Sequence, residues 1–489
     1  MSIVSGSYTG TPDAHTVNLG YIYSYIIAFL YKNFPNIEWY AIGMYCSMYI
    51  AYMTFITCIL RSSKSPKLKL LLFFTVSIIQ IYFELRPHSV NTSIELSIAA
   101  SLVLIYSPKL KSTIWAAILF FLSSQYRFLA TFIPLFILIP LFILQYKRKQ
   151  SFKFIIVKIA TCTLFFSISF VSNAIAYSPP MWKQYKKENA IRLFIVDHPQ
   201  RKWVYDIIKD PIEADTYMLM EKYRIMDSDI MPLHVFERYI NWLKKRSLTI
   251  ARCNYKDYIR SYSDIGLLGL IYITMCCFIF LVKKQNKKGI IVFISSLSLF
   301  FMQNYFLMIQ THPKERYLLG MLLALTLVCI EIPTNKITQI GLLGICLNFA
   351  VLDKNSLLEN TSIIANSNEL QKIMYENGAN KICLMSGTNR PLDFFNTSNN
   401  YISIHYVNFG WMMHLPFNHL PAKGLKNIAI GMPFIISKND KELPILLQRI
   451  LLNHFHKKTE IIIEQNSANF TIMRFTPVDN SYSTNRTYK

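Results

Sequence analysis

Two residues near the start of the chain, Asp13 and His15, have the types and the spacing of an acid–base pair. A carboxylate can accept a proton or orient an imidazole, and an imidazole changes its charge near neutral pH. They end the run Ser5-Gly6-Ser7-Tyr8-Thr9-Gly10-Thr11-Pro12-Asp13-Ala14-His15, whose glycines and proline predict an ordered loop. The alternative is that Asp13 caps the helix that follows, and the spacing alone favours the cap over catalysis.

Basic residues in three separate loops are the second group of candidates for chemistry. The loops are Glu84–Asn91, Gln125–Arg127 and Thr311–Tyr317, and each borders an apolar segment. Guanidinium and ammonium groups hold phosphate oxygens, so these loops predict a phosphate or lipid-donor site. Anchoring in lipid headgroups explains the cations equally well. The candidate residues are Arg86, His88, Arg127, Lys314 and Arg316.

A third candidate is a divalent-cation site at Asp227 and Asp229. Carboxylate oxygens at this spacing can ligate Mg or Mn. Acidic pairs are common in solvated loops, so a plain polar loop is the favoured interpretation. The predicted chemistry treats the metal as optional.

The composition of the chain indicates which kind of structural element must position these residues. The chain has 489 residues, of which 52% are hydrophobic, arranged as long apolar runs between short basic loops. This pattern predicts an α-helical polytopic membrane protein in the lipid bilayer. The net charge of +23 lies largely in loops beside apolar runs, as the positive-inside rule expects, so nucleic acid is excluded as a partner. Cys253 and Cys383 lie in polar regions, and pairing between them stays open.

Hydropathy predicts about ten or eleven membrane spans. The ten spans are Trp39–Leu60, Leu68–Phe83, Thr92–Tyr106, Thr113–Ser124, Leu129–Leu144, Phe154–Ala176, Ile265–Val282, Ile290–Ile309, Tyr317–Ile330 and Ile337–Val351. With these spans the basic loops fall on one side, which the positive-inside rule assigns to the cytoplasm. The candidate residues and the C-terminal tail fall on the other side.

The segment Val17–Tyr31 is apolar, short and rich in Tyr, and we interpret it as a helix lying along the membrane interface. Residues 1–16 contain no Lys or Arg, which suits a segment that faces outward. An outward N-terminus without a signal peptide is hard to translocate. One hypothesis is therefore that Met1 is an internal methionine and that a further span precedes it in the reading frame.

The tail after Val351 predicts a small α/β domain, because short strands alternate with helices. The predicted helices are Asn366–Asn377 and Lys441–Phe455, and the predicted strands are Lys381–Met385, Tyr401–Val407, Pro433–Ile436, Glu460–Glu464 and Phe470–Phe475. Met231–Lys245 predicts an amphipathic helix. The expected divisions are residues 1–38 (outward loop and interfacial helix), 39–176 (first part of the bundle), 177–264 (large outward helical loop), 265–351 (second part of the bundle) and 352–489 (extracytoplasmic α/β domain).

This arrangement resembles the GT-C class of membrane glycosyltransferases. The features that carry the resemblance are an acid in the first outward loop, an interfacial helix, many spans and an outward C-terminal domain. The run from Ser5 to His15, closed by Trp39-Tyr40, also resembles polytopic proteins of bacterial surface-polysaccharide gene clusters. The resemblance implies a multi-pass protein of the bacterial cytoplasmic membrane that moves a sugar from a polyprenyl-phosphate donor to a glycan or lipid-linked acceptor. Asp13 would then be the general base and His15 would position it or share its proton.

Two other functions remain open. The first is an O-antigen or capsule repeat-unit polymerase, against which the separate C-terminal domain argues. The second is a transporter of lipid-linked glycans, which calls for mid-span charges and repeated halves. The sequence shows few such charges and no internal repeat, so the transporter ranks third.

Overall fold

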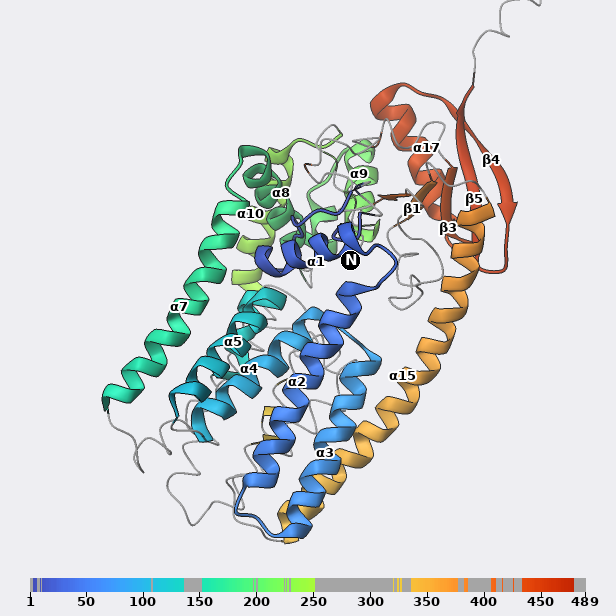
Figure 1. Ribbon diagram of the computed structural model, residues 1–489. Helices are drawn as coiled ribbons and strands as arrows, with labels where there is room; N and C mark the ends of the chain where they lie inside the picture. The colour runs from blue at the N-terminus through green and yellow to red at the C-terminus, as the bar shows by residue number, and fades with distance from the viewer. Residues whose placement is uncertain are drawn as a thin grey trace, which may run out of the picture.

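Among the residues that the structure describes, five stretches of helix are long and apolar enough to cross a membrane, and they pack into one bundle (Figure 1). The computed structural model describes residues 3–6, 9, 11–106, 109–135, 152–196, 198, 201–223, 225, 227, 230–250, 320, 323–324, 326–327, 336–376, 382–385, 406–409, 416, 425 and 433–478. The bundle is formed by α2 (Trp39–Arg61), α3 (Pro66–Leu85), α4 (Ser89–Tyr106), α5 (Leu110–Arg127) with the 3-10 helix η1 (Phe128–Phe132), and α7 (Phe152–Ala176). These helices support a multi-pass membrane protein.

Helix α4 is the centre of this bundle. It packs against α2 on one side and α5 on the other. Its apolar side chains, including Ile94, Ile98 and Leu102, are fully buried. The apolar side chains of α7 are largely exposed instead, for example Ile159 and Phe170. A helix that is apolar on all sides fits either a protein core or lipid, so α4 is the protein-facing helix and α7 the lipid-facing one.

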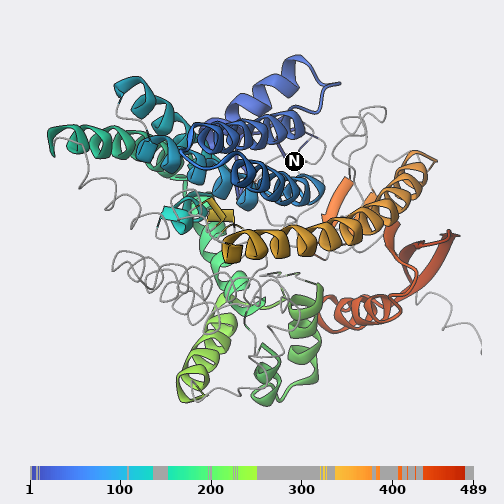
Figure 2. The same cartoon turned by 90° about the horizontal axis from the view of Figure 1, so that it is seen from below.

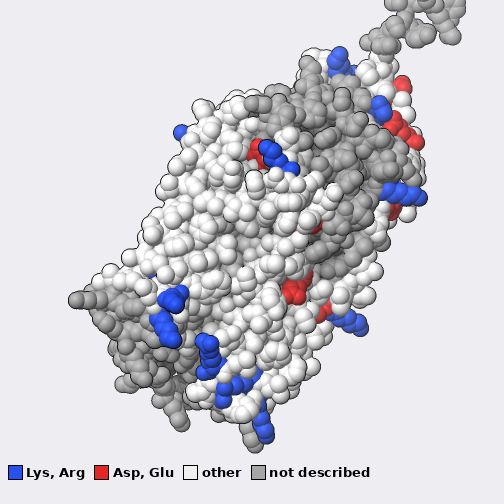
Figure 3. All heavy atoms as spheres, viewed as in Figure 1, with Lys and Arg blue, Asp and Glu red and all other residues white. Residues whose placement is uncertain are grey.

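The two ends of the bundle differ in charge. At the lower end of the molecule the charged side chains in view are Lys and Arg, whereas toward the upper end Asp and Glu occur beside Lys and Arg (Figure 3). Arg61 ends α2, Lys64 lies in the α2–α3 turn, Lys67 is in the first turn of α3, and Lys109 and Lys111 flank the start of α5, all at this lower end. The lower end of the described bundle is therefore basic, but Lys and Arg are not confined to it.

The opposite end carries helix α1 (Tyr21–Asn33), which runs across the ends of the bundle helices (Figure 1). It has 13 residues, fewer than the roughly 20 that a full crossing needs. One of its faces packs on the bundle through Tyr23, Ile27 and Tyr31. The loop to α2 is tied down by Glu38, whose carboxylate accepts a hydrogen bond from the Tyr31 hydroxyl (2.8 Å).

A group of short helices lies at the same end as α1. It contains α8 (Pro180–Val196), the 3-10 helix η2 (Arg201–Asp206), α9 (Pro211–Tyr223) and α10 (Leu233–Ile250). Its core combines aliphatic and aromatic side chains, and the Tyr217 and Tyr239 rings meet edge to face with centroids 5.1 Å apart. The amphipathic helix predicted at Met231–Lys245 is confirmed, since Tyr239 and Leu243 are fully buried.

The described residues of the C-terminal part form a five-stranded sheet with a helix, at the same end of the bundle (Figure 1). The strands are β1 (Ile382–Met385), β2 (Tyr406–Phe409), β3 (Pro433–Ser437), β4 (Thr459–Asn466) and β5 (Phe470–Pro477), in the order β2-β1-β3-β5-β4. Strand β1 pairs parallel with β2 and β3, and β5 pairs antiparallel with β3 and β4. Helix α17 (Glu442–Phe455) buries Leu443, Leu447 and Ile450 in a core shared with Phe434 of β3.

Helix α15 (Lys336–Glu376) joins the bundle to the sheet and differs from the prediction. The sequence predicts a span ending at Val351 and a separate helix at Asn366–Asn377, whereas the structure has one continuous helix of 41 residues. It packs beside α3 and extends to the sheet (Figures 1 and 2). At its far end, Glu369 accepts hydrogen bonds from the backbone and side-chain amides of Asn469.

The other predicted spans have mixed outcomes. The predicted boundary at Leu129 falls inside the continuous stretch Leu110–Leu135. Residues 136–151, and the predicted spans Ile265–Val282 and Ile290–Ile309, lie outside the described residues, as does most of Tyr317–Ile330. Cys253 lies outside them as well. The side of the membrane on which each end lies stays a prediction.

Candidate functional site

The loop that holds Asp13 and His15 is ordered by a turn at Gly6. Gly6 has φ +84°, a conformation that side chains with a Cβ rarely adopt. A Cβ there would also meet the backbone nitrogen of Pro12 at 2.7 Å. The turn brings the Asp13 N–H to the Ile3 carbonyl (3.1 Å). The ordered turn predicted in this loop is therefore confirmed for its described residues, and the turn requires a glycine at position 6.

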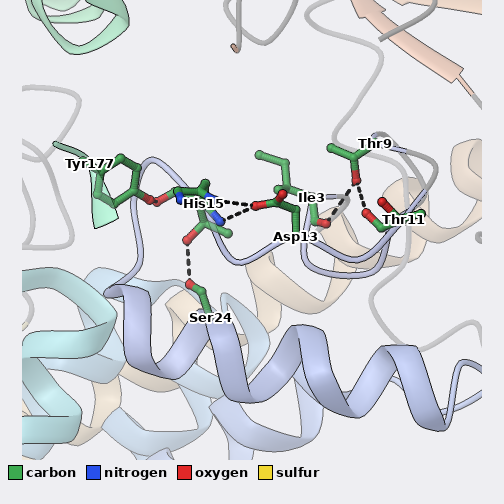
Figure 4. Close-up of polar contacts among 8 residues, drawn as sticks. Ile3, Thr9, Thr11, Asp13, His15, Ser24 and Tyr177 are labelled. Carbon is green, nitrogen blue, oxygen red and sulfur yellow. Dashed lines mark hydrogen bonds and ion pairs between the residues drawn. The ribbon is translucent and has the colours of Figure 1, made fainter. Parts of the chain in front are cut away.

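Asp13 and His15 form a hydrogen-bonded pair (Figure 4). Asp13 Oδ1 accepts from the His15 backbone N–H at 2.7 Å and lies 2.8 Å from His15 Nδ1. An ionised carboxylate only accepts hydrogen bonds, so Nδ1 carries the proton and donates it to Asp13. In the neutral ring Nε2 is then the acceptor. The pair is about one-quarter exposed, which leaves it within reach of a substrate.

Helix capping, the alternative role for Asp13, does not occur. Helix α1 begins at Tyr21 with Gly20 as its N-cap residue and no side-chain cap. The carboxylate of Asp13 instead closes a local turn onto the residue two positions later. This turn and the bond to the ring fix both the direction and the tautomer of the imidazole.

Three aromatic rings surround the imidazole of His15. Trp182 stacks on it, with centroids 5.1 Å apart and an interplanar angle of 16°. Tyr177 meets it edge-on at 5.6 Å, and Tyr21 lies at 5.3 Å. Burial and the neighbouring Asp13 raise the pKa of the Tyr177 phenol, which therefore stays protonated and donates to the Thr16 carbonyl. The rings restrict water around the pair and present flat apolar surfaces beside it.

The segment after His15 is anchored to the bundle by neutral hydrogen bonds. The Gln125 carbonyl accepts from the Gly20 N–H, and the Gln125 side chain accepts from the Tyr23 N–H at 3.1 Å. Asn173 of α7 accepts from the Tyr21 N–H at 2.8 Å. Thr16 and Ser24 share a hydrogen bond at 2.7 Å (Figure 4). The position of His15 is therefore set by α5 and α7 as well as by its own loop.

Two cationic side chains lie next to this loop. Arg127, at the end of α5, donates to the side chain of Asn18 at 2.7 Å. Lys186 of α8 places its ammonium 3.9 Å from the centroid of the Tyr177 ring. Burial lowers the pKa of Lys186 from its ordinary value. Arg127, one of the predicted phosphate-binding residues, is thus bonded to the segment that follows the loop of Asp13 and His15.

The other predicted cations are placed differently. Arg86 follows α3 and lies over the Tyr82 ring, with 5.4 Å between the guanidinium carbon and the centroid. His88 starts the turn into α4, where its Nδ1 accepts from the Val90 N–H at 3.0 Å. Both belong to the α3–α4 turn rather than to the loop of Asp13. Lys314 and Arg316 lie outside the described residues.

Asp227 is held by the protein backbone. Its side chain is buried and accepts from the Leu425 N–H at 2.6 Å. Asp229, its predicted partner in a metal site, lies outside the described residues. Within the described ranges there is no group of three or more His, Cys, Asp or Glu residues that could hold a metal ion. The bond to Leu425 gives Asp227 a structural role that links this loop to the C-terminal part.

Sequence reasoning did not find Tyr177, Trp182 and Lys186. They lie more than 160 residues after His15, so no local spacing relates them to it. The one available signal was a pair of aromatic residues directly after the span that ends at Ala176. That pattern is typical of an interfacial aromatic belt and does not point to a site.

Comparison with protein-family models, with curated proteins and with solved structures found no match to this chain.

Proposed function

We propose that this chain is a membrane glycosyltransferase that moves a sugar from a polyprenyl-phosphate donor to a hydroxyl of a surface glycan or lipid-linked acceptor. The observation that carries the proposal is the Asp13–His15 pair, stacked on Trp182 at one end of a membrane bundle. Such a pair can remove a proton from an acceptor hydroxyl. Its place at the end of the bundle suits a substrate with a lipid tail and a polar head.

His15 is the proposed general base. Asp13 holds the Nδ1–H, so Nε2 presents its lone pair to the acceptor hydroxyl. As the acceptor oxygen attacks the anomeric carbon, its proton passes to Nε2 and the bond from carbon to phosphate oxygen breaks. Asp13 stabilises the imidazolium that forms. This division of roles differs from the sequence-based expectation, in which Asp13 was the base.

The departing phosphate gains negative charge, and Arg127 and Lys186 are the proposed groups that stabilise it. Both lie next to the loop of the Asp13–His15 pair. Charge-assisted hydrogen bonds to phosphate are strongest in partly desolvated sites. Lys186 is an exposed residue, so its ammonium is within reach of a phosphate that arrives at the loop.

The exposed apolar face of helix α1 is an argument for a lipid-linked substrate. Its face away from the bundle exposes Tyr25, Ile26 and Phe29, each more than half exposed. A short helix with one apolar face toward the protein and another toward its surroundings fits the membrane interface. A polyprenyl chain passing along α1 would bring its phosphate to the loop beside the helix.

The proposed location is the outer face of a bacterial cytoplasmic membrane. The lower end of the bundle shows Lys and Arg without Asp or Glu in the view of Figure 3, and by the positive-inside rule we assign that end to the cytoplasm. The loop of His15, the short helices and the sheet would then be extracytoplasmic.

The test replaces His15 by Gln and Asp13 by Asn in the cells that produce the native glycan. The readout is the glycan mass, with the abundance of the protein in the membrane as a control. We expect H15Q to remove one sugar from the glycan, through a loss of rate of about 10²–10⁴-fold. The matched control is His234→Gln, an exposed histidine on α10.

Each other outcome changes the proposal. Loss of chain length with intact repeat units would replace the transferase by a polymerase. Complete lipid-linked units that fail to reach the outer face would favour a transporter. An unchanged glycan in H15Q, at normal abundance, would remove the Asp13–His15 pair from the chemistry.

A further inference from the structure

The most enclosed helix of the bundle carries a carboxylate. Glu95 lies in the second turn of α4, about 9 Å along the helix from Ser89, and its side chain is fully buried. Hydropathy does not single out Glu95, because one acidic residue changes the mean hydropathy of an apolar span little. An ionisable group inside a membrane bundle is costly unless something compensates its charge. Glu95 therefore needs a partner.

The described neighbours of Glu95 offer acceptors rather than donors. Neither carboxylate oxygen of Glu95 has a hydrogen-bond partner in the part of the chain that the structure describes. The same holds for Oε1 of Gln80 on α3 and Oδ1 of Asn91 on α4, both nearly fully buried. Asn91 precedes Glu95 by one helical turn, so both lie on the same face of α4. Four oxygen atoms thus lack a donor.

The side-chain donors of Gln80, Asn91 and Ser97 are already used. The Gln80 amide lies near the Glu95 carboxylate. Its N–H donates to Glu84 at 3.3 Å instead, and it makes no hydrogen bond of good geometry to Glu95. The Asn91 amide donates to the Arg86 carbonyl at 3.4 Å. The nearby hydroxyl of Ser97 donates to Thr131 at 2.6 Å. Within the part of the chain that the structure describes, the acceptor oxygens of Gln80, Asn91 and Glu95 are therefore left without a donor.

We propose that Gln80, Asn91 and Glu95 bind a small monovalent cation, a proton or a sodium ion, between α3 and α4. Carboxylate and amide oxygens are ligands for hard cations. One buried carboxylate is neutralised by one positive charge, which favours a monovalent over a divalent ion. A sodium ion would satisfy the carboxylate and amide oxygens together, and a proton on Glu95 would be shared with one amide oxygen.

The position of the site indicates how the cation enters. Glu84 lies one helical turn from Gln80 toward the α3–α4 turn and is half-buried. It interacts with both Gln80 and Glu95, so it connects the buried carboxylate with the bundle end that carries Arg86. The cation therefore enters from the end of the bundle where α1 lies.

The test places the full chain in liposomes and treats it with dicyclohexylcarbodiimide. This apolar reagent modifies protonated carboxyl groups in apolar surroundings. Peptide masses report which carboxyl groups react, at several pH values and in sodium or choline chloride. We expect Glu95 to react, whereas the exposed Glu442 in the same digest stays unmodified. If the site binds sodium, labelling of Glu95 should be about tenfold slower at a sodium concentration near ten times the dissociation constant for sodium. Choline should have no effect. Labelling that falls as pH rises but ignores sodium identifies the proton as the cation.

A second measurement does not depend on access of the reagent. Sodium, or a lower pH, should raise the melting temperature of the unmodified protein in detergent, and Glu95→Gln should remove that response. If Glu95→Gln fails to accumulate, Gln80→Leu keeps the carboxylate and should weaken the response. The proposal is overturned if Glu95 stays unlabelled and the melting temperature of the unmodified protein responds to neither sodium nor pH.

Discussion

Two junctions hold the parts of this molecule together, and they use different chemistry. The buried part of the loop junction joins the segment Thr16–Tyr23 to α5 and α7 through neutral hydrogen bonds to Gln125 and Asn173, and at its exposed edge Arg127 of α5 donates to Asn18. The head junction joins α9 to α17 through charged groups. There Arg449 makes two hydrogen bonds to Asp215, at 2.7 and 2.8 Å, and Lys222 pairs with Glu442.

The difference follows from the medium around each junction. Gln125 is fully buried, whereas the side chains of Arg449 and Lys222 are nearly half exposed. Removing an ion pair from water costs more than removing a neutral amide, so charged contacts suit the wet junction and neutral ones the dry junction. The type of contact in each junction thus follows from how far its side chains are exposed to water. The buried neutral contacts are consistent with a loop junction near the membrane.

The largest expected effect is that of Gly20→Ala in the loop junction. A Cβ at Gly20 would lie 2.8 Å from the Cα of Gln125, and a backbone atom cannot move aside as a flexible side chain can. We expect a loss of about 1–3 kcal/mol in stability, as for overpacking of a core. The measurements are the melting temperature of the full chain in detergent and the rate of proteolysis in residues 1–20.

Gly344→Ala is the matched control for this prediction. Gly344 lies in α15, and an added Cβ there meets no atom within 4 Å. Replacing a helical glycine at such a position is expected to stabilise by about 0.4–1 kcal/mol. Equal melting temperatures for the two variants would contradict the close packing of Gly20 on α5.

A smaller effect is expected from Arg449→Met in the head junction. The pair with Asp215 is partly exposed, so its contribution to stability is about 0.2–1 kcal/mol, and salt screens it. We expect the difference in melting temperature between this variant and the unmodified protein to shrink as sodium chloride increases. Gly20→Ala should show no such dependence on salt.

Arg474→Met is the control for this comparison, because Arg474 pairs with Glu464 within the β4–β5 pair and does not cross the junction. A cross-link between α9 and α17 should form less readily in Arg449→Met but not in Arg474→Met. If both variants behave alike, the ion pair does not hold the junction.

The smallest expected effect is the pH dependence of the head junction at His454. Its Nε2 lies 3.0 Å from the Thr216 hydroxyl, and burial lowers its pKa, although the nearby Asp210, Asp227 and Asp215 oppose the shift. The neutral ring is thus favoured in the folded protein. The neutral His454 ring makes its full contribution to stability above the ordinary histidine pKa of about 6.5. This contribution is lost as the pH falls toward the lowered pKa of His454 in the folded protein. His454→Asn should flatten this part of a plot of melting temperature against pH, and an unchanged slope would exclude His454 as its source.

Much of the helical fold could be predicted from the sequence because apolar runs and charged turns are local signals. Helix α2 was expected at Trp39–Leu60 and spans Trp39–Arg61. The strands β3, β4 and β5 were expected within a few residues of their bounds. The length of α15 was missed because polar residues from Asp353 onward were interpreted as the end of a span. Such residues end an apolar run without ending a helix.

The site could be predicted only as far as its local part. Asp13 and His15 are two residues apart, so spacing alone suggested their contact. Trp182 reaches His15 only through the packing of α7 and α8, which no short-range pattern encodes. The roles within the pair also required geometry, because the bond from Nδ1 to Asp13 decides which nitrogen is the base.

Helix α15 has a mechanical consequence. Its 41 residues form a rod about 60 Å long, held beside α3 near one end, where Thr75 contacts Cys346, and joined to the sheet by Glu369 near the other. A tilt of only about 5° at its base would carry the far end through about 5 Å, given that length. A rigid helix of this length therefore converts a small change of angle in the bundle into a displacement of several ångströms at the sheet.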